Sequence, residues 1–163
     1  MADLLTHVLI GYAAATLLSR RYEWLTGTWV TIAMIGALLP DLDHVSMIVS
    51  AGEIHRALGV PFSWTVLQTG GGVLVTILVG TVLPVEHRRR VFALLWLGAG
   101  LHLFADVLVR VPDGRSQSVF WPLTQYQPPS PGLYLSTDLW PLLVAAALAF
   151  GSWSVARYQS SDW

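Results

Sequence analysis

The sequence predicts an all-α protein, a polytopic membrane bundle of about five apolar helices. Hydrophobic residues make up 54% of the 163-residue chain, and charged residues make up 12%, against about 25% in an average soluble domain. The nine basic and ten acidic residues are also clustered, which leaves long uncharged stretches between them. Because a spanning helix needs about 17–25 mainly apolar residues, these stretches indicate membrane helices.

Five apolar segments follow one another along the chain. Pro40 ends the second and Pro84 ends the third, because proline lacks the N–H that a helix interior requires. The third contains Gly70-Gly71-Gly72, which permits either close helix packing or a local break. The oligomeric state stays open. The segments cover residues 4–19, 24–39, 61–83, 91–109 and 139–156.

Residues 112–137 predict a long extramembrane loop. Five prolines oppose helix formation there, and the aromatic residues suit a membrane–water interface. The length of the chain indicates one integral-membrane domain over residues 1–163.

Arginine placement predicts the orientation in the cell membrane. Cytoplasmic loops carry an excess of basic residues, so the side with more arginines is expected to be cytoplasmic. The multi-pass chain would then have its N-terminus outside and its C-terminus in the cytoplasm. With five alternating spans, six arginines fall on one side (Arg20, Arg21, Arg88, Arg89, Arg90 and Arg157) and three on the other (Arg56, Arg110 and Arg115).

Composition excludes several classes of function. A net charge of −1 leaves no basic face for nucleic acid, and the absence of cysteine excludes disulfides and thiolate catalysis. The remaining partners are the lipid bilayer and a lipid or other amphiphilic substrate.

Histidines and aspartates from distant segments gather at the predicted outer side. His7 lies near the start of the first segment, and His102 and Asp106 lie near the end of the fourth. Pro40-Asp41-Leu42-Asp43-His44 follows the second segment. Ionisable side chains against apolar helices are costly and are therefore functional candidates, and imidazole with carboxylate suits zinc and similar ions.

Each motif also has a structural alternative. His102 and Asp106 stand at i and i+4 on one helix face, where they can bind one metal or form a stabilising hydrogen bond. The acidic stretch at Asp41 and Asp43 can bind metal or form a solvated helix stop. His55-Arg56 can belong to an interfacial loop, or Arg56 can hold an anionic oxygen through its planar fork.

The same residues resemble the YdjM-like family of membrane-bound metal-dependent hydrolases. The resemblance rests on Thr6-His7, the segment 36–44, His55-Arg56, the segment 101–106 and Phe120-Trp121-Pro122-Leu123. It implies an integral membrane protein with a metal-dependent hydrolase site. The motif order is also similar, distantly, to zinc-dependent phospholipase C, which implies metal ligands at His7, Asp41 or Asp43, His55, His102 and Asp106.

These observations predict a metal-dependent hydrolase of phosphoester or ester bonds, with an outward-facing site and a divalent metal, zinc being the expected ion. Two alternatives stay open. The first is a non-catalytic protein with a structural metal or polar network. It is favoured because this chain lacks the Thr-His-Ser that family members carry after His-Arg. The second is a transport or channel component. The expected metal ligands are His7, Asp41, Asp43, His55, His102 and Asp106, and the expected catalytic residues are His44 and Arg56.

Overall fold

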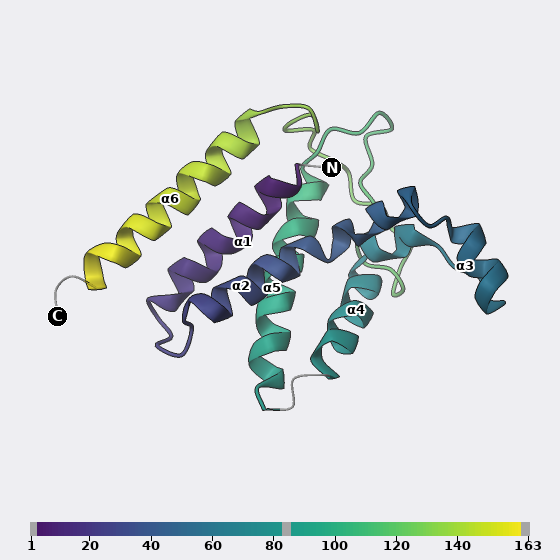
Figure 1. Ribbon diagram of the computed structural model, residues 1–163. Coiled ribbons are helices and arrows are strands. Elements are labelled where there is room, and N and C mark those ends of the chain that lie inside the picture. Colours follow the sequence, from purple (N-terminus) through teal and green to yellow (C-terminus); the bar gives the residue numbers. More distant parts are fainter. Residues whose placement is uncertain (1–2, 83–85, 161–163) are drawn as a thin grey trace.

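The computed structural model describes residues 3–82 and 86–160. Within these residues the regular elements are helices, and no β-strand occurs (Figure 1). The elements are α1 (Leu4–Ser19), α2 (Gly27–Leu38), η1 (Pro40–Met47), α3 (Ala51–Leu58), η2 (Trp64–Gln68), α4 (Gly70–Val82), α5 (Arg88–Val107) and α6 (Trp140–Ser160), with η denoting 3₁₀ helix.

The five predicted apolar segments form α1, α2, α4, α5 and α6, so the all-α prediction is confirmed. The third segment is not one continuous helix: η2 ends at Gln68 and α4 begins at Gly70. Of the two predictions for the glycine triplet, the local break is the one observed. The predicted end of that segment, at residues 83–84, lies outside the described residues.

Two helices, α5 and α6, are long and apolar enough to cross a membrane. α2 and η1 together would form a third span, bent by 55° at Pro40. α1 and α4 are apolar but have only 16 and 13 residues. At about 1.5 Å per residue, α4 falls short of a hydrocarbon core about 30 Å thick. Length therefore separates the five apolar helices into clear spans and shorter ones.

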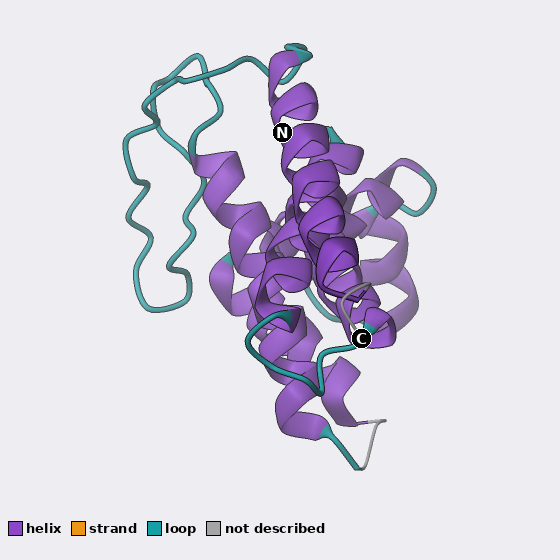
Figure 2. Cartoon of the chain, turned by 90° about the vertical axis from the view of Figure 1, so that its left-hand side faces the viewer, coloured by secondary structure: helices purple, strands orange, loops and turns teal. Residues whose placement is uncertain are grey.

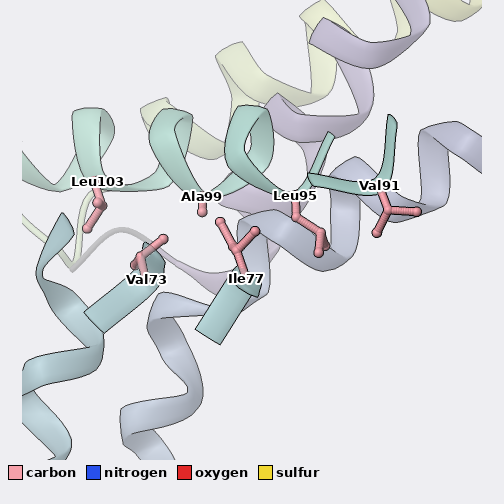
Figure 3. Close-up of a cluster of buried hydrophobic side chains, with 6 residues drawn as sticks. All are labelled: Val73, Ile77, Val91, Leu95, Ala99 and Leu103. Atoms are coloured by element: carbon pink, nitrogen blue, oxygen red, sulfur yellow. The ribbon is translucent and has the colours of Figure 1, made fainter. Parts of the chain in front are cut away.

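α4 and α5 share a buried apolar cluster (Figure 3). Val73 and Ile77 point from α4 toward a row of α5 side chains. The row repeats every four residues, which places all its members on one helix face. It consists of Val91, Leu95, Ala99 and Leu103.

α2 and α5 cross at very short range because small residues line their contact. A Cβ atom on Gly98 would collide with the Ala33 carbonyl oxygen and lie 2.6 Å from the Ala37 nitrogen. A Cβ atom on Gly36 would lie 2.7 Å from the Leu95 Cα atom. Close backbone approach through small residues is typical of helices in membranes. The crossing therefore brings the C-terminal end of α2 against the middle of α5.

The two ends of α5 differ in their neighbours. At its start, the Arg90 guanidinium lies over the Trp24 ring, 4.6 Å from the centroid, so the α1–α2 connection lies at this end. At its other end, the Tyr134 hydroxyl donates to the Ala105 carbonyl at 2.8 Å. Tyr134 belongs to the loop between α5 and α6, which contains no helix, as predicted for residues 112–137; Figure 2 shows loops in teal at the side of the helix bundle.

α3 forms an arm that projects from the bundle (Figure 1). Ser50 and Glu53 form a reciprocal capping box at its start, and Gly59 ends it in the left-handed conformation at φ 69°. None of the residues of α3 is buried. We call residues 50–60 the α3 arm.

Candidate metal centre

Four side chains from three separate elements meet beside the C-terminal end of α5. They form what we call the central group: His7 of α1, Asp41 of η1, and His102 and Asp106 of α5. The Nε2 atom of His102 lies 3.7 Å from Asp41 Oδ1 and 3.3 Å from Asp106 Oδ2. His7 Nε2 lies 3.4 Å from Asp106 Oδ1. Both imidazoles are fully buried, and Asp41 is 6% exposed.

Local sequence explains how each element delivers its side chain. Pro40 follows the C-cap residue of α2, Leu39, and the chain bends there, so Asp41 turns inward at the start of η1. His102 and Asp106 are four residues apart on α5 and therefore share one face. His7 lies in the second turn of α1, and its ring stacks on that of His102 with centroids 3.6 Å apart.

A backbone hydrogen bond fixes the orientation of His102. Its Nδ1 atom lies 2.7 Å from the Ala37 carbonyl oxygen. A carbonyl can only accept, so Nδ1 carries the hydrogen and the Nε2 of a neutral ring carries a lone pair. This lone pair faces the carboxylates of Asp41 and Asp106, which also can only accept. A cation or a proton between these atoms is therefore needed to make the arrangement favourable.

Several polar atoms at this position are buried and lack a hydrogen-bond partner. They are both ring nitrogens of His7, both carboxylate oxygens of Asp41 and Nε2 of His102. Buried polar atoms in folded proteins are hydrogen-bonded in about 90% of cases or more, so such a concentration needs a cause. One ligand atom each from His7, Asp41 and His102 lie within 4.8 Å of one another, as around a single metal ion.

A second group continues from the first toward solvent. It comprises Asp41, Asp43 and His44, and we call it the rim group. His44 Nδ1 lies 2.9 Å from Asp43 Oδ1 and 3.0 Å from the Asp41 backbone oxygen. The His44 side chain is 50% exposed. Asp41 belongs to both groups and joins the buried centre to its partly exposed edge.

The other two predicted site residues lie elsewhere. His55 and Arg56 are on the α3 arm, and both are exposed. The Nδ1 atom of His55 contacts the Val60 carbonyl at 2.8 Å, and Arg56 Nε donates to the Gly52 carbonyl at 3.3 Å. Neither belongs to the central or the rim group. The structure thus brings together five predicted metal ligands with His44 and leaves His55 and Arg56 on the arm.

Two glutamines take part in the site although the sequence interpretation did not single them out. The Gln68 amide donates to Asp43 Oδ2, and the Gln117 amide donates to Gln68 Oε1. This chain of hydrogen bonds connects the rim group with the loop between α5 and α6. Gln68 stands out in the sequence as a long polar side chain within an apolar segment. A search restricted to charged residues and histidines passes over it.

Tyr134 was also missed, although it adjoins the centre. Burial and the nearby negative charge of Asp106 raise the pKa of Tyr134 to about 12. The phenol therefore keeps its proton and its hydrogen bond to Ala105 at neutral pH.

A cavity of about 240 Å³ opens beside the central group, and because both polar and apolar side chains line it we call it the mixed cavity. Asp106 lines it from α5, Gln68 from η2, and Arg115 and Gln117 from the loop. A small polar group can therefore approach Asp106 from this cavity.

Comparison with known proteins gives one match. The model of the YdjM inner membrane protein family matches residues 1–162. No curated protein and no solved structure matches the chain. The similarity to zinc-dependent phospholipase C is not among these findings and stays a prediction from motif order. The match covers nearly the whole chain, and the chain belongs to the YdjM inner membrane protein family.

Proposed function

We propose that this membrane protein is a metal-dependent hydrolase that cleaves a phosphoester or ester bond of a lipid or similar amphiphile. The observation that carries the proposal is the set of buried ring nitrogens and carboxylate oxygens without hydrogen-bond partners. Such atoms are costly to bury unless a cation binds them. These atoms belong to three of the predicted metal ligands: His7, Asp41 and His102.

The donor set fits a divalent metal, zinc above all. His7, Asp41, His102 and Asp106 supply imidazole nitrogen and carboxylate oxygen, which are usual zinc ligands. With both imidazoles neutral, the two carboxylates would leave two negative charges here, and a divalent cation offsets them. The Ala37 carbonyl orients His102, as backbone carbonyls commonly do for metal-binding histidines.

The proposed chemistry divides among named residues. When bound, a divalent metal supplies Lewis-acid polarisation of the scissile group and activation of water. His44 is half exposed and contacts Asp43, so its ring is placed to carry protons between the centre and solvent. Arg115 lines the cavity that contains Asp106 and can hold an anionic oxygen there. This is the role that the sequence assigned to Arg56.

The proposed topology is multi-pass, with the N-terminus outside and the C-terminus in the cytoplasm. Arg90 and the α1–α2 connection lie together at one end of the bundle, and the positive-inside rule makes that end cytoplasmic. The central group, near the other end of α5, then faces outward.

Metal analysis of the purified protein tests the site. We expect about one zinc or more per chain in the wild type and loss of it in His102→Ala and Asp106→Ala. His55→Ala is the matched control, since it removes the same side chain from outside both groups. Equal metal content in all four proteins would refute the proposal. Phosphate or fatty-acid release from lipid vesicles then measures hydrolysis.

A non-catalytic metal or polar network is the second candidate. It is favoured by the full burial of the His7 and His102 side chains, the two imidazoles of the central group. Thermal melts with and without chelator separate the candidates. A protein that binds zinc and melts earlier with chelator, but hydrolyses no lipid in either form, has a structural metal.

A further inference from the structure

An apolar groove runs along α5 beside the candidate centre. It lies between the start of α4, the second half of α5 and the loop that follows α5, and its volume is about 700 Å³. Ligand pockets commonly measure about 300–1,000 Å³ and are mainly apolar. Its lining is almost wholly apolar and includes Leu74, Trp96, Phe104 and Trp121.

Backbone hydrogen bonds hold the loop wall of this groove in place. The Gly70 N–H donates to the Val119 carbonyl at 2.7 Å, and the Gly71 N–H donates to the Trp121 carbonyl at 2.8 Å. These are among the first N–H groups of α4, which have no partner within the helix. A Cβ atom on Gly71 would lie 2.5 Å from the Trp121 oxygen, so the contact requires glycine there.

The groove and the mixed cavity share a wall. Leu103, Val107 and Val119 line both of them. On the far side of this wall lie Asp106 of the central group and Arg115, with Asp113 also at the cavity. An apolar groove next to a cavity that presents charged side chains matches the two parts of an amphiphile.

The composition and exposure of the groove lead us to expect that it faces the hydrocarbon. It lies on α5, which is long and apolar enough to span the membrane, and Phe104 in its lining is 65% exposed. A lipid chain can therefore enter sideways from the bilayer without crossing water.

We infer that the groove binds one acyl chain of an anionic membrane phospholipid, whose head group then lies in the mixed cavity beside Asp106 and Arg115. The assignment of that lipid as substrate rests on the proposed function, whereas binding of its acyl chain in the groove does not. Arg115, together with the proposed metal, supplies the positive charge that a phosphate requires.

Photo-crosslinking in phosphatidylglycerol nanodiscs tests this inference. The probe is a phosphatidylglycerol that carries a diazirine in one acyl chain, and peptide mass spectrometry locates the labelled residues. We expect labelling to concentrate on residues 96–107 and 119–128. The exposed side chains of α6, such as Leu143, Leu148 and Phe150, report ordinary contact with surrounding lipid.

Gly100→Leu is the variant that fills the groove. Gly100 lines it, and a Cβ atom there meets nothing within 4 Å, so the side chain enters open space. We expect labelling of the groove to fall about tenfold, as when about two chain methylenes lose their burial. Gly151→Leu on α6 is the matched control, because a Cβ atom there also meets nothing within 4 Å.

Leu123→Asp covers the case in which Gly100→Leu fails to fold. Leu123 lines the groove and is 92% exposed, so its replacement leaves the core unchanged. The inference would be overturned if the groove were labelled no more strongly than α6. It would also be overturned if the folded groove variants left the labelling unchanged. Zinc content is measured on the same samples. Groove labelling without zinc would refute the proposed function alone, and zinc without groove labelling would refute this inference alone.

Discussion

Two histidine-bearing regions of the molecule differ sharply in what surrounds them. His102 of α5 is fully buried, is oriented by the Ala37 carbonyl and faces two carboxylates. His55 of the α3 arm is exposed and contacts only a carbonyl of its own arm among the described contacts. Each motif suggested a metal ligand. The difference shows that convergence and burial, rather than the motif alone, distinguish a candidate site.

The largest expected effect comes from overpacking the α2–α5 crossing. Gly98→Val would drive a side chain into the backbone at Ala33 and Ala37, and we expect a loss of about 3 kcal/mol or more in stability. Gly52→Val on the α3 arm has open space, with Ser50 Oγ the nearest atom at 3.9 Å, and should cost much less. Thermal melts in detergent compare the two variants. Similar melting temperatures would contradict the close crossing.

Metal affinity should separate the two histidines next. We expect His102→Ala to lower zinc affinity by about a hundredfold or more, since even loss of an outer partner costs about 10–100-fold. His55→Ala should leave the affinity unchanged because the residue lies outside the group. Competition with a zinc-binding dye measures both values. A comparable loss in His55→Ala would place the arm in the site after all.

The glutamine chain should give a smaller change. Gln68→Leu removes the hydrogen bonds to Asp43 and Gln117 and leaves their polar groups without this partner. We expect a cost of about 1–3 kcal/mol, the usual penalty for a polar group left unpaired in a partly buried site. Thermal melting measures the cost. Gln125→Leu in the exposed part of the loop is the control, and an equal effect there would refute a specific role for Gln68.

The smallest effect concerns pH and the α3 arm. Hydrogen bonds from the Ser50 N–H and hydroxyl to Glu53 lower the pKa of the Glu53 carboxyl. The lowered pKa means that this cap stabilises α3 at pH values above the ordinary carboxyl range. The contribution is lost as the pH falls through the lowered pKa.

Amide hydrogen exchange of α3, corrected for intrinsic rates, measures this from about pH 6 to about pH 3. We expect protection to fall with pH in the wild type, whereas Glu53→Gln should remove most of the dependence. Protection of α5 around His102 should not follow the same curve. The same pH dependence of protection in α3 and α5 would mean that the arm and the bundle open together.

Much of the fold could be predicted from local patterns. α1 has the bounds that were predicted for the first segment, and α5 begins three residues before its predicted start. The break at Gly70 was one of two predictions because a glycine triplet permits either outcome. The number of membrane spans was harder to predict, since apolar composition does not distinguish a 13-residue helix such as α4 from a longer one.

The sequence by itself determined the apolar helices, the scarcity of charge and the shared face of His102 and Asp106, because these depend on neighbours along the chain. The tertiary structure decided which residues join them. Asp41 arrives through the bend at Pro40 and the glycine-lined crossing of α2 and α5. His7 arrives because α1 packs on α2, where a Cβ atom on Gly11 would lie 3.2 Å from the Ala37 Cβ atom. The tertiary structure also separated His55 from the central group and placed Gln68 beside the rim group. These contacts join residues 25 to 99 positions apart, and no local spacing encodes them.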